Sequence, residues 1–132
     1  GMGITVLNAR SEKNLRGVHP ALVAVVRRAH ELARDAGRDF IVTEGLRSRE
    51  RQAELFRLKA TTTMNSRHLT GHAVDLAALV GTQVRWDWPL YDKLAEYMQR
   101  AADGLGTAIV WGGSWKTFKD GPHFELDRKV FP

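Results

Sequence analysis

The chain has 132 residues, a length that supports one hydrophobic core and therefore one domain. It contains no cysteine, which excludes disulfides and thiolate metal sites, so any bound metal must be held by nitrogen and oxygen atoms. The formal net charge of +5 favours polyanionic partners without choosing between nucleic acid and an anionic cell envelope. No apolar run reaches the length of a membrane span and no N-terminal stretch resembles a secretory signal, so we expect a cytoplasmic product.

Hydrophobic spacing and turn residues predict helices interspersed with short strands, which is typical of a compact α+β domain with a small antiparallel sheet and about three main helices. A proline in the first turn begins a core helix at Pro20, which ends near Gly37. Residues 39–44 are predicted to form a strand, and Ser48 is expected to cap the helix that follows Gly45. The buried side of that helix is expected to comprise Ala53, Leu55, Phe56 and Leu58.

The second half of the chain continues this alternation of strands and helices. Its predicted elements are a buried strand over residues 73–79, a loop over 81–88, a helix from Asp87 to Gly104, and strands over 107–111 and 122–126. Near the N-terminus, Ser11 is expected to cap a short turn of helix. His19 and His30 lack partners at fixed offsets, so we expect them at the surface or its boundary and not on a metal.

One short segment, residues 66–75, combines a serine, two histidines, a glycine and an aspartate. A loop bent at Gly71 and running into a strand could bring His68 and Asp75 onto one metal ion. A second segment places His123 in an apolar and aromatic setting, three residues after Asp120. Two imidazoles and one carboxylate are a usual donor set for catalytic zinc, with a fourth position left for water. Asp120 would then lie outside the ligand set, where a general base is needed.

These segments resemble a known family of enzymes. The pattern Ser-x-His-x-x-Gly-x-Ala-x-Asp, followed by an acidic residue and Pro-His-Phe, is similar to the zinc peptidases that act on bacterial cell-wall peptides. Those peptidases comprise the D-alanyl-D-alanine dipeptidases and carboxypeptidases and the L-alanyl-D-glutamate endopeptidases of phage endolysins. The resemblance extends to residues 44–48 and Gln52. It implies that zinc is bound by His68, Asp75 and His123, that the catalytic base is Asp120, and that the substrate carbonyl or oxyanion is contacted by Arg47.

Two features favour the endolysin branch of this family. The dipeptidases usually have glutamate where this chain has Asp120, and the chain is small, with paired tryptophans at Trp111 and Trp115. The resemblance therefore implies a single zinc peptidase domain over residues 2–132 that hydrolyses the L-alanyl-D-glutamate bond of peptidoglycan stem peptides. The alternatives are a D-alanyl-D-alanine carboxypeptidase or dipeptidase, and a cell-wall binding module without turnover.

The resemblance also implies the biological setting. A monomer would stay in the host bacterial cytoplasm until a separate holin-type protein permeabilises the membrane and releases it to the cell wall. Nucleic-acid binding is the alternative that charge suggests, and it would make association strongly salt-dependent. We disfavour it because no helix or loop arranges basic and stacking residues for that purpose.

Four more residues are candidates for supporting the metal or contacting substrate. Ser66 is expected to hydrogen-bond the metal-binding carboxylate or to hold the loop. Gln52 either forms part of the site wall beside Arg47 or solvates its helix. His72 is a candidate because it follows His68 by four residues, although the glycine between them argues against a helical zinc motif. Trp115 is expected on the substrate side. The alternative for Arg47 is a surface pair with Glu44 or Glu50.

Overall fold

The computed structural model describes residues 7–132, so the predicted domain start at residue 2 lies outside the described residues. The described part contains the α-helices α1 (Ala9–Asn14), α2 (Pro20–Asp35), α3 (Arg49–Arg57) and α4 (Trp88–Leu105). Its strands are β1 (Asp39–Glu44), β2 (Ala73–Val80), β3 (Gln83–Arg85), β4 (Ile109–Trp111) and β5 (His123–Leu126). Two short 3-10 helices, η1 (Arg67–Thr70) and η2 (Gly112–Ser114), precede β2 and follow β4. The predicted α+β class is confirmed.

Strand β2 is the centre of a five-stranded sheet in which every pairing is antiparallel. It pairs with β1 along one edge, while β3 and β5 pair with opposite ends of its other edge. Strand β4 pairs with β5 and completes the order β1-β2-β5-β4. A register shift between Val42 and Glu44 places Glu44 opposite Asp75. Such bulges re-aim side chains, and this one aims Glu44 at the candidate site.

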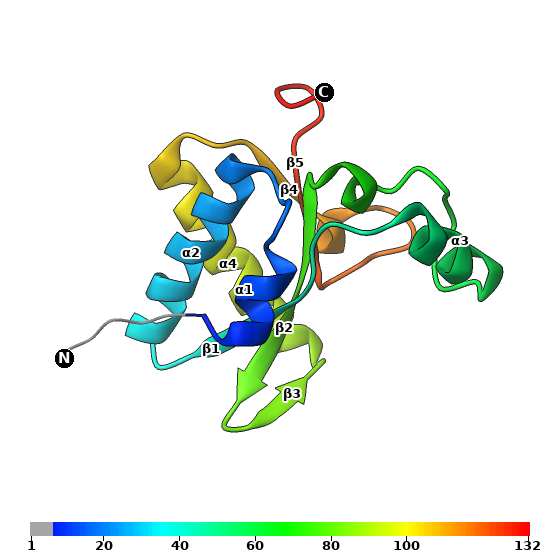
Figure 1. The fold of residues 1–132 in the computed structure, drawn as a ribbon. Helices are drawn as coiled ribbons and strands as arrows, with labels where there is room; N and C mark the ends of the chain where they lie inside the picture. Colours follow the sequence, from blue (N-terminus) through cyan, green and yellow to red (C-terminus); the bar gives the residue numbers. More distant parts are fainter. Residues whose placement is uncertain (1–6) are drawn as a thin grey trace.

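The hydrophobic core lies between one face of the sheet and helices α2 and α4 (Figure 1). Alternation along β2 points one set of side chains into this core and Asp75 to the opposite face. The fully or nearly fully buried members include Leu22, Val25, Val26, Val74, Leu76, Leu94, Met98, Phe124 and Leu126. The sheet therefore has a packed helical face and a second face that is free to carry polar groups.

Strand β1 is an edge strand, and no strand of the described residues pairs with its outer edge. Helix α1 covers that edge instead. The Ser11 hydroxyl accepts a hydrogen bond from the Val42 amide at 2.9 Å, and the Asn14 side chain donates to the Val42 carbonyl at 2.8 Å. The prediction that Ser11 caps the helix is wrong, because Asn8 does so by accepting from the Ser11 amide at 2.8 Å. A buried serine is used here to satisfy a strand edge.

The predicted buried side of α3 is also wrong. Phe56 is 47% exposed and Leu58 58% exposed, and the buried residue of this helix is Gln52. The helix projects from the sheet on the side away from α2 and α4, so its apolar residues have no core to enter (Figure 1). Ser48 does cap α3, since its hydroxyl accepts from the Arg51 amide.

Three smaller differences concern residues outside the candidate site. Part of the loop predicted over residues 81–88 forms the short strand β3, which makes a hairpin with β2. His30 is buried and bonds Asp39 at 2.8 Å, whereas a surface or boundary position was predicted. Helix α4 continues to Leu105 and ends at Gly106, whose φ of 68° lies in the left-handed region that favours glycine. No helix within residues 7–132 is both long enough and apolar enough to cross a membrane.

Candidate metal centre

Three side chains predicted to bind metal meet on the polar face of the sheet. Asp75 and His123 are directly opposite each other on β2 and β5, so their side chains share one face. His68 reaches them from η1, which ends at Gly71 with a φ of 74°. At Gly71 a Cβ atom would lie 2.4 Å from the Gly17 carbonyl oxygen, so only glycine fits this bend. The predicted bend at Gly71 is thus present, and it places His68 next to strand β2.

The geometry of the cluster suits a metal ion. His68 Nε2 lies 3.3 Å and His123 Nδ1 3.4 Å from the same Asp75 oxygen, Oδ1. One ligand atom from each residue lies within 4.8 Å of the others, and both histidines are buried. Two imidazole nitrogens and a carboxylate oxygen are the donor types that zinc accepts in catalytic sites. The described residues therefore could hold a divalent ion here.

Hydrogen bonds on the far side of each ring fix which nitrogen faces the cluster. His68 Nδ1 lies 2.8 Å from the Gly45 carbonyl oxygen, which can only accept, so Nδ1 carries the hydrogen and Nε2 is free for a metal. His123 Nε2 lies 2.8 Å from Glu125 Oε1, so Nδ1 of this ring faces Asp75. The two histidines would thus bind through different nitrogens.

Glu125 is the residue of this site that the sequence analysis missed. It is 7% exposed and lies two positions after His123 on β5, on the same face of the sheet. The signal that could have found it is the strand period of two, which places residues 123 and 125 side by side. The predicted strand at 122–126 already contained that information.

Without a metal ion, the contacts in the cluster favour a negatively charged Asp75 paired with a protonated His123 ring. Burial alone would raise the pKa of Asp75, but hydrogen bonds from His123 and His68 hold it well below its usual range. Burial alone would lower the pKa of His123, but its contacts with Asp75 and Glu125 raise it to about 9. A divalent ion bound by His123 Nδ1 would have to replace that proton, because an imidazole binds a metal through a deprotonated nitrogen.

Asp120 lies beside the cluster, on the loop between η2 and β5. Its amide donates to the Gly112 carbonyl at 3.1 Å and its carbonyl accepts from the His123 amide at 3.2 Å. Burial, together with the negative charge of Asp75, raises the pKa of the Asp120 carboxyl. Burial, and then the negative charges of Asp120 and Asp75, raise the pKa of Tyr91 to about 12. A carboxyl with a raised pKa near a metal is suited to proton transfer.

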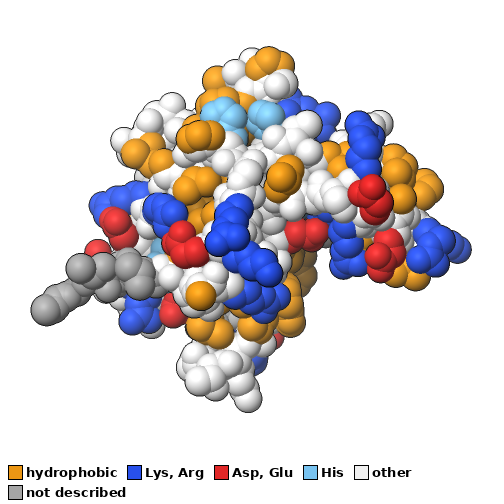
Figure 2. Space-filling model, viewed as in Figure 1, with side chains coloured by type: hydrophobic (Ala, Val, Ile, Leu, Met, Phe, Trp, Pro, Cys, Tyr) orange, Lys and Arg blue, Asp and Glu red, His pale blue; other side chains and the backbone are white. Residues whose placement is uncertain are grey.

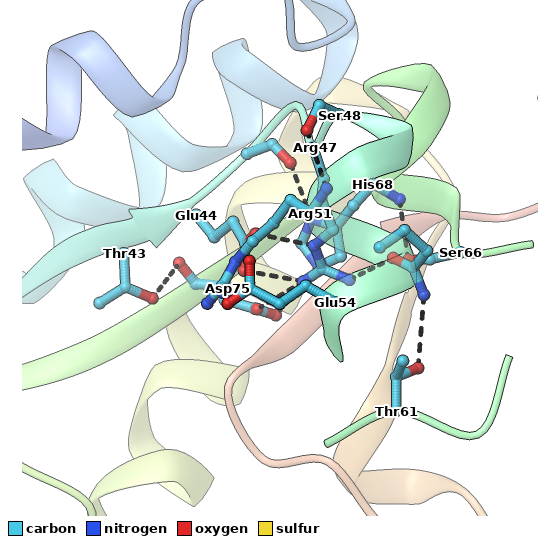
Figure 3. Close-up of polar contacts among 12 residues, drawn as sticks. Thr43, Glu44, Arg47, Ser48, Arg51, Glu54, Thr61, Ser66, His68 and Asp75 are labelled. Atoms are coloured by element: carbon cyan, nitrogen blue, oxygen red, sulfur yellow. Dashed lines mark hydrogen bonds and ion pairs between the residues drawn. The ribbon is translucent and has the colours of Figure 1, made fainter. Parts of the chain in front are cut away.

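Arg47 is buried, not on the surface, although it does pair with Glu44 as the alternative interpretation expected. Its Nε and one terminal nitrogen each bond Glu44 at 2.7 Å, and the other terminal nitrogen bonds Gln52 at 2.8 Å. The guanidinium also lies 3.8 Å from Asp75 Oδ2, between the acid of β1 and that of β2 (Figure 3). Arg47 therefore places a fixed positive charge next to the cluster.

The structure brings three of the four supporting candidates to the site. The Ser66 hydroxyl accepts from the His68 amide at 3.2 Å, which holds the start of η1. Gln52 is fully buried and bonds Arg47 and the Thr63 carbonyl. The Trp115 ring packs against His123 with a centroid distance of 5.1 Å. His72, by contrast, bonds the Thr70 hydroxyl at 2.7 Å, and its ring centroid lies 5.5 Å from that of His19. Among the described residues, no contact joins the His72 side chain to the cluster.

A cavity of about 890 Å³ opens directly over the cluster. His68, Asp75, His123 and Asp120 lie along it, as do Arg47 and Trp115. The lining is completed by Leu55 of α3 and by the segments around residues 59–66 and 118–119, which we call the facing wall. Figure 2 shows basic, acidic and hydrophobic side chains interspersed over the lobe that contains α3. The volume falls in the range of sites that bind small molecules or short peptides.

Comparison with known proteins finds relatives of one kind. The family described as phage L-alanyl-D-glutamate peptidase matches residues 2–131. The chain is similar to the L-alanyl-D-glutamate peptidase of Listeria phage A118, with 31% identity over 93% of the chain, and spans only 43% of that protein. It is also similar to the peptidoglycan L-alanyl-D-glutamate endopeptidase CwlK of Bacillus subtilis, with 29% identity over 83% of the chain and 73% of CwlK.

Solved structures share the fold. The L-Ala D-Glu endopeptidase ChiX of Serratia marcescens superposes with a TM-score of 0.87 and 50% identity, over 94% of this chain and 91% of ChiX. The D,D-dipeptidase VanXYg superposes with a TM-score of 0.55 at 20% identity, over 83% of this chain and 50% of VanXYg. At that identity the likeness concerns the fold alone.

Proposed function

Because the chain belongs to the phage L-alanyl-D-glutamate peptidase family, we propose that it is a zinc-dependent endopeptidase that hydrolyses the L-alanyl-D-glutamate bond of peptidoglycan stem peptides. The observation that carries the proposal is the convergence of His68, Asp75 and His123 at the floor of the cavity, with Asp120 beside them. Proteins that bear this activity in their names, ChiX, CwlK and the Listeria phage peptidase, are similar to most of the chain.

The metal would be held by His68 Nε2, Asp75 and His123 Nδ1. When bound, zinc acts as a Lewis acid on the substrate carbonyl and lowers the pKa of a water ligand. The chain contributes the orientation of the ligands, because the Gly45 carbonyl and Glu125 fix the two imidazole rings. It also contributes the cavity in which the peptide would lie across these residues.

We assign the proton transfers to Asp120. We assign to Arg47 the stabilisation of the negative charge that develops on the carbonyl oxygen. Asp120 would accept a proton from the attacking water, whose oxygen bonds to the L-alanine carbonyl carbon, and would give that proton to the departing nitrogen as the C–N bond breaks. One product then carries a free amine on D-glutamate, and the other ends in the carboxylate of L-alanine. The guanidinium of Arg47 lies on the other side of Asp75, where it would stabilise the tetrahedral oxyanion. Its hydrogen bonds to Glu44 and Gln52 hold it in place before substrate arrives.

Digestion of purified cell walls tests the proposal. The zinc-loaded protein should expose new amino termini that belong to D-glutamate, and Asp120→Asn should not. Release of D-alanine would instead identify a carboxypeptidase or dipeptidase. Tight binding to walls without new amino termini would identify a binding module.

The wider setting belongs to the same proposal. Residues 2–132 would act as one catalytic domain and as a monomer, which light scattering of the purified chain measures directly. A holin-type protein would give it access from the host cytoplasm to the wall. When the chain is expressed in bacteria together with such a protein, the cells should lyse. When it is expressed alone, the chain should accumulate without lysis.

A further inference from the structure

Glu125 is a buried acid that the proposed reaction does not use. It is 7% exposed on the polar face of β5, and its Oε1 lies 2.8 Å from His123 Nε2. Burying a carboxylate is costly unless cationic groups compensate it. Glu125 is buried although this is unfavourable, and it contacts a histidine that would bind the metal. Both facts point to a role in the site.

Two arginines compensate the other oxygen of Glu125. Its Oε2 lies 3.8 Å from Arg67 Nε and 3.6 Å from Arg128 Nε. The Arg128 side chain is 65% exposed, but that of Arg67 is only 10% exposed. Arg67 Nε is buried and makes no hydrogen bond among the described residues, so the ion pair with Glu125 is its main interaction there.

Arg67 is itself fixed at both ends. Its backbone begins η1, directly before His68. One terminal nitrogen donates to the Leu126 carbonyl at 3.1 Å and to the Phe131 carbonyl at 2.6 Å. The guanidinium therefore joins the segment that carries one metal-binding histidine to the strand that carries the other.

We propose that Glu125 is a positioning residue that orients His123 for metal binding, and that Arg67 holds its carboxylate in place. The carboxylate accepts the Nε2 hydrogen of His123, so Nδ1 is the nitrogen directed at the cluster and the one whose proton a metal ion would replace. A negative charge behind the ring also makes the imidazole a stronger donor to a cation. The inference rests on the proposed metal site, but it concerns affinity for the ion and not hydrolysis.

Zinc affinity, measured without any peptide by competition with a chromophoric chelator, tests this role. Glu125→Gln keeps the shape and removes the charge, and we expect its zinc dissociation constant to rise by roughly 10- to 100-fold. Glu31→Gln is the matched control, because Glu31 is an exposed acid on α2 paired with Arg28. It should bind zinc as the unaltered chain does.

A second measurement does not depend on any variant folding correctly. In the zinc-loaded chain, long-range proton–nitrogen NMR should show His123 with its hydrogen on Nε2 and His68 with its hydrogen on Nδ1. A His123 ring with its hydrogen on Nδ1, or a Glu125→Gln protein whose dissociation constant rises less than tenfold, would overturn the positioning role. Failure of the unaltered chain to bind zinc would overturn both this inference and the proposed metal site, whereas zinc binding without hydrolysis would contradict only the proposed function.

Discussion

The two walls of the cavity are built in different ways. Asp75 and His123 stand on central strands, and the residues next to them in sequence, Val74 and Phe124, are fully buried in the core behind. The facing wall has little packing of this kind, since Phe118 is 76% exposed and Leu55 is only partly buried. Lys59 and Phe118 also adopt positive φ angles of 60° and 52°, which are uncommon for residues with side chains.

This difference separates two tasks. The wall that would bind the ion is held by strand pairing and by hydrogen bonds, so its geometry exists before any ligand arrives. The facing wall exposes apolar side chains that a substrate can cover, and it can adjust with little loss of core packing. Variants in the first wall should therefore affect metal and chemistry, and variants in the second should affect substrate binding.

The largest effect is expected for a ligand in the rigid wall. His123→Ala should remove a donor that no neighbour can replace, so zinc content should fall from about one ion per chain towards zero and hydrolysis should be lost. His30→Ala is the matched control, because His30 on α2 is equally buried but bonds Asp39 and not the cluster. Metal analysis of both proteins measures the contrast, and unchanged zinc in His123→Ala would show that the ligand set is wrong.

The next effect concerns the base. Asp120→Asn should retain zinc and lower turnover by roughly 10²- to 10⁴-fold, because the amide cannot accept the proton. Asp103→Asn, an exposed residue of α4 that bonds Gln99, should leave both unchanged. Parallel metal analysis and wall digestion separate the two quantities. Normal turnover in Asp120→Asn would remove this residue from the mechanism.

The pH dependence of metal binding follows from the raised pKa of His123. Burial opposes the shift, but Asp75 and Glu125 raise the pKa of the ring to about 9 in the metal-free protein. Since the ion must displace that proton, apparent zinc affinity should rise about tenfold per pH unit up to about pH 9 and then level off. Titrations with a chelator at several pH values measure this slope, and a flat profile from pH 7 to 9 would contradict the protonated pair.

Stability of the metal-free protein should follow the opposite trend. The folded pKa of His123, about 9, lies above its ordinary value of 6.5. The contribution of the protonated ring is therefore fully present below pH 6.5 and is lost as the pH rises through about 9. Denaturant unfolding in the presence of a chelator should show this decline, and His123→Ala should lack it.

The sequence was most informative about the rigid wall. The glycine bend and the strand pattern predicted how His68 could reach Asp75, because both depend on local backbone rules. His123 was added from the donor set and the family resemblance, since no local rule predicts that its strand pairs with that of Asp75. Strand alternation also places Glu125 beside His123, but the residue was missed because an acid in a short apolar strand carries no motif of its own. Local rules also failed for α3, whose apolar residues fit a helical stripe but meet no core. Which side of a helix is buried depends on tertiary packing, which periodicity does not contain.

Removing the one buried side chain of α3 should loosen the second wall. Gln52 accepts from Arg47 at 2.8 Å and donates to the Thr63 carbonyl at 2.6 Å, so it ties the helix to both the site and the following loop. Gln52→Ala should cost about 1–3 kcal/mol of folding stability, because it leaves buried partners unsatisfied. Hydrogen exchange should rise in residues 49–66 and not in β2. Equal protection in both regions would show that the two walls open together.

The smallest effect on stability, and the sharpest separation of the walls, is expected at Phe118. Its ring lines the cavity but is 76% exposed, so Phe118→Ala should change the free energy of unfolding by less than about 0.5 kcal/mol. If the ring covers bound substrate, the same variant should raise KM several-fold while zinc content and kcat stay constant. Val130→Ala is the matched control, since Val130 is 61% exposed and does not line the cavity. A fall in kcat at unchanged KM would mean that the exposed wall contributes to the chemistry, and the division between the two walls would not hold.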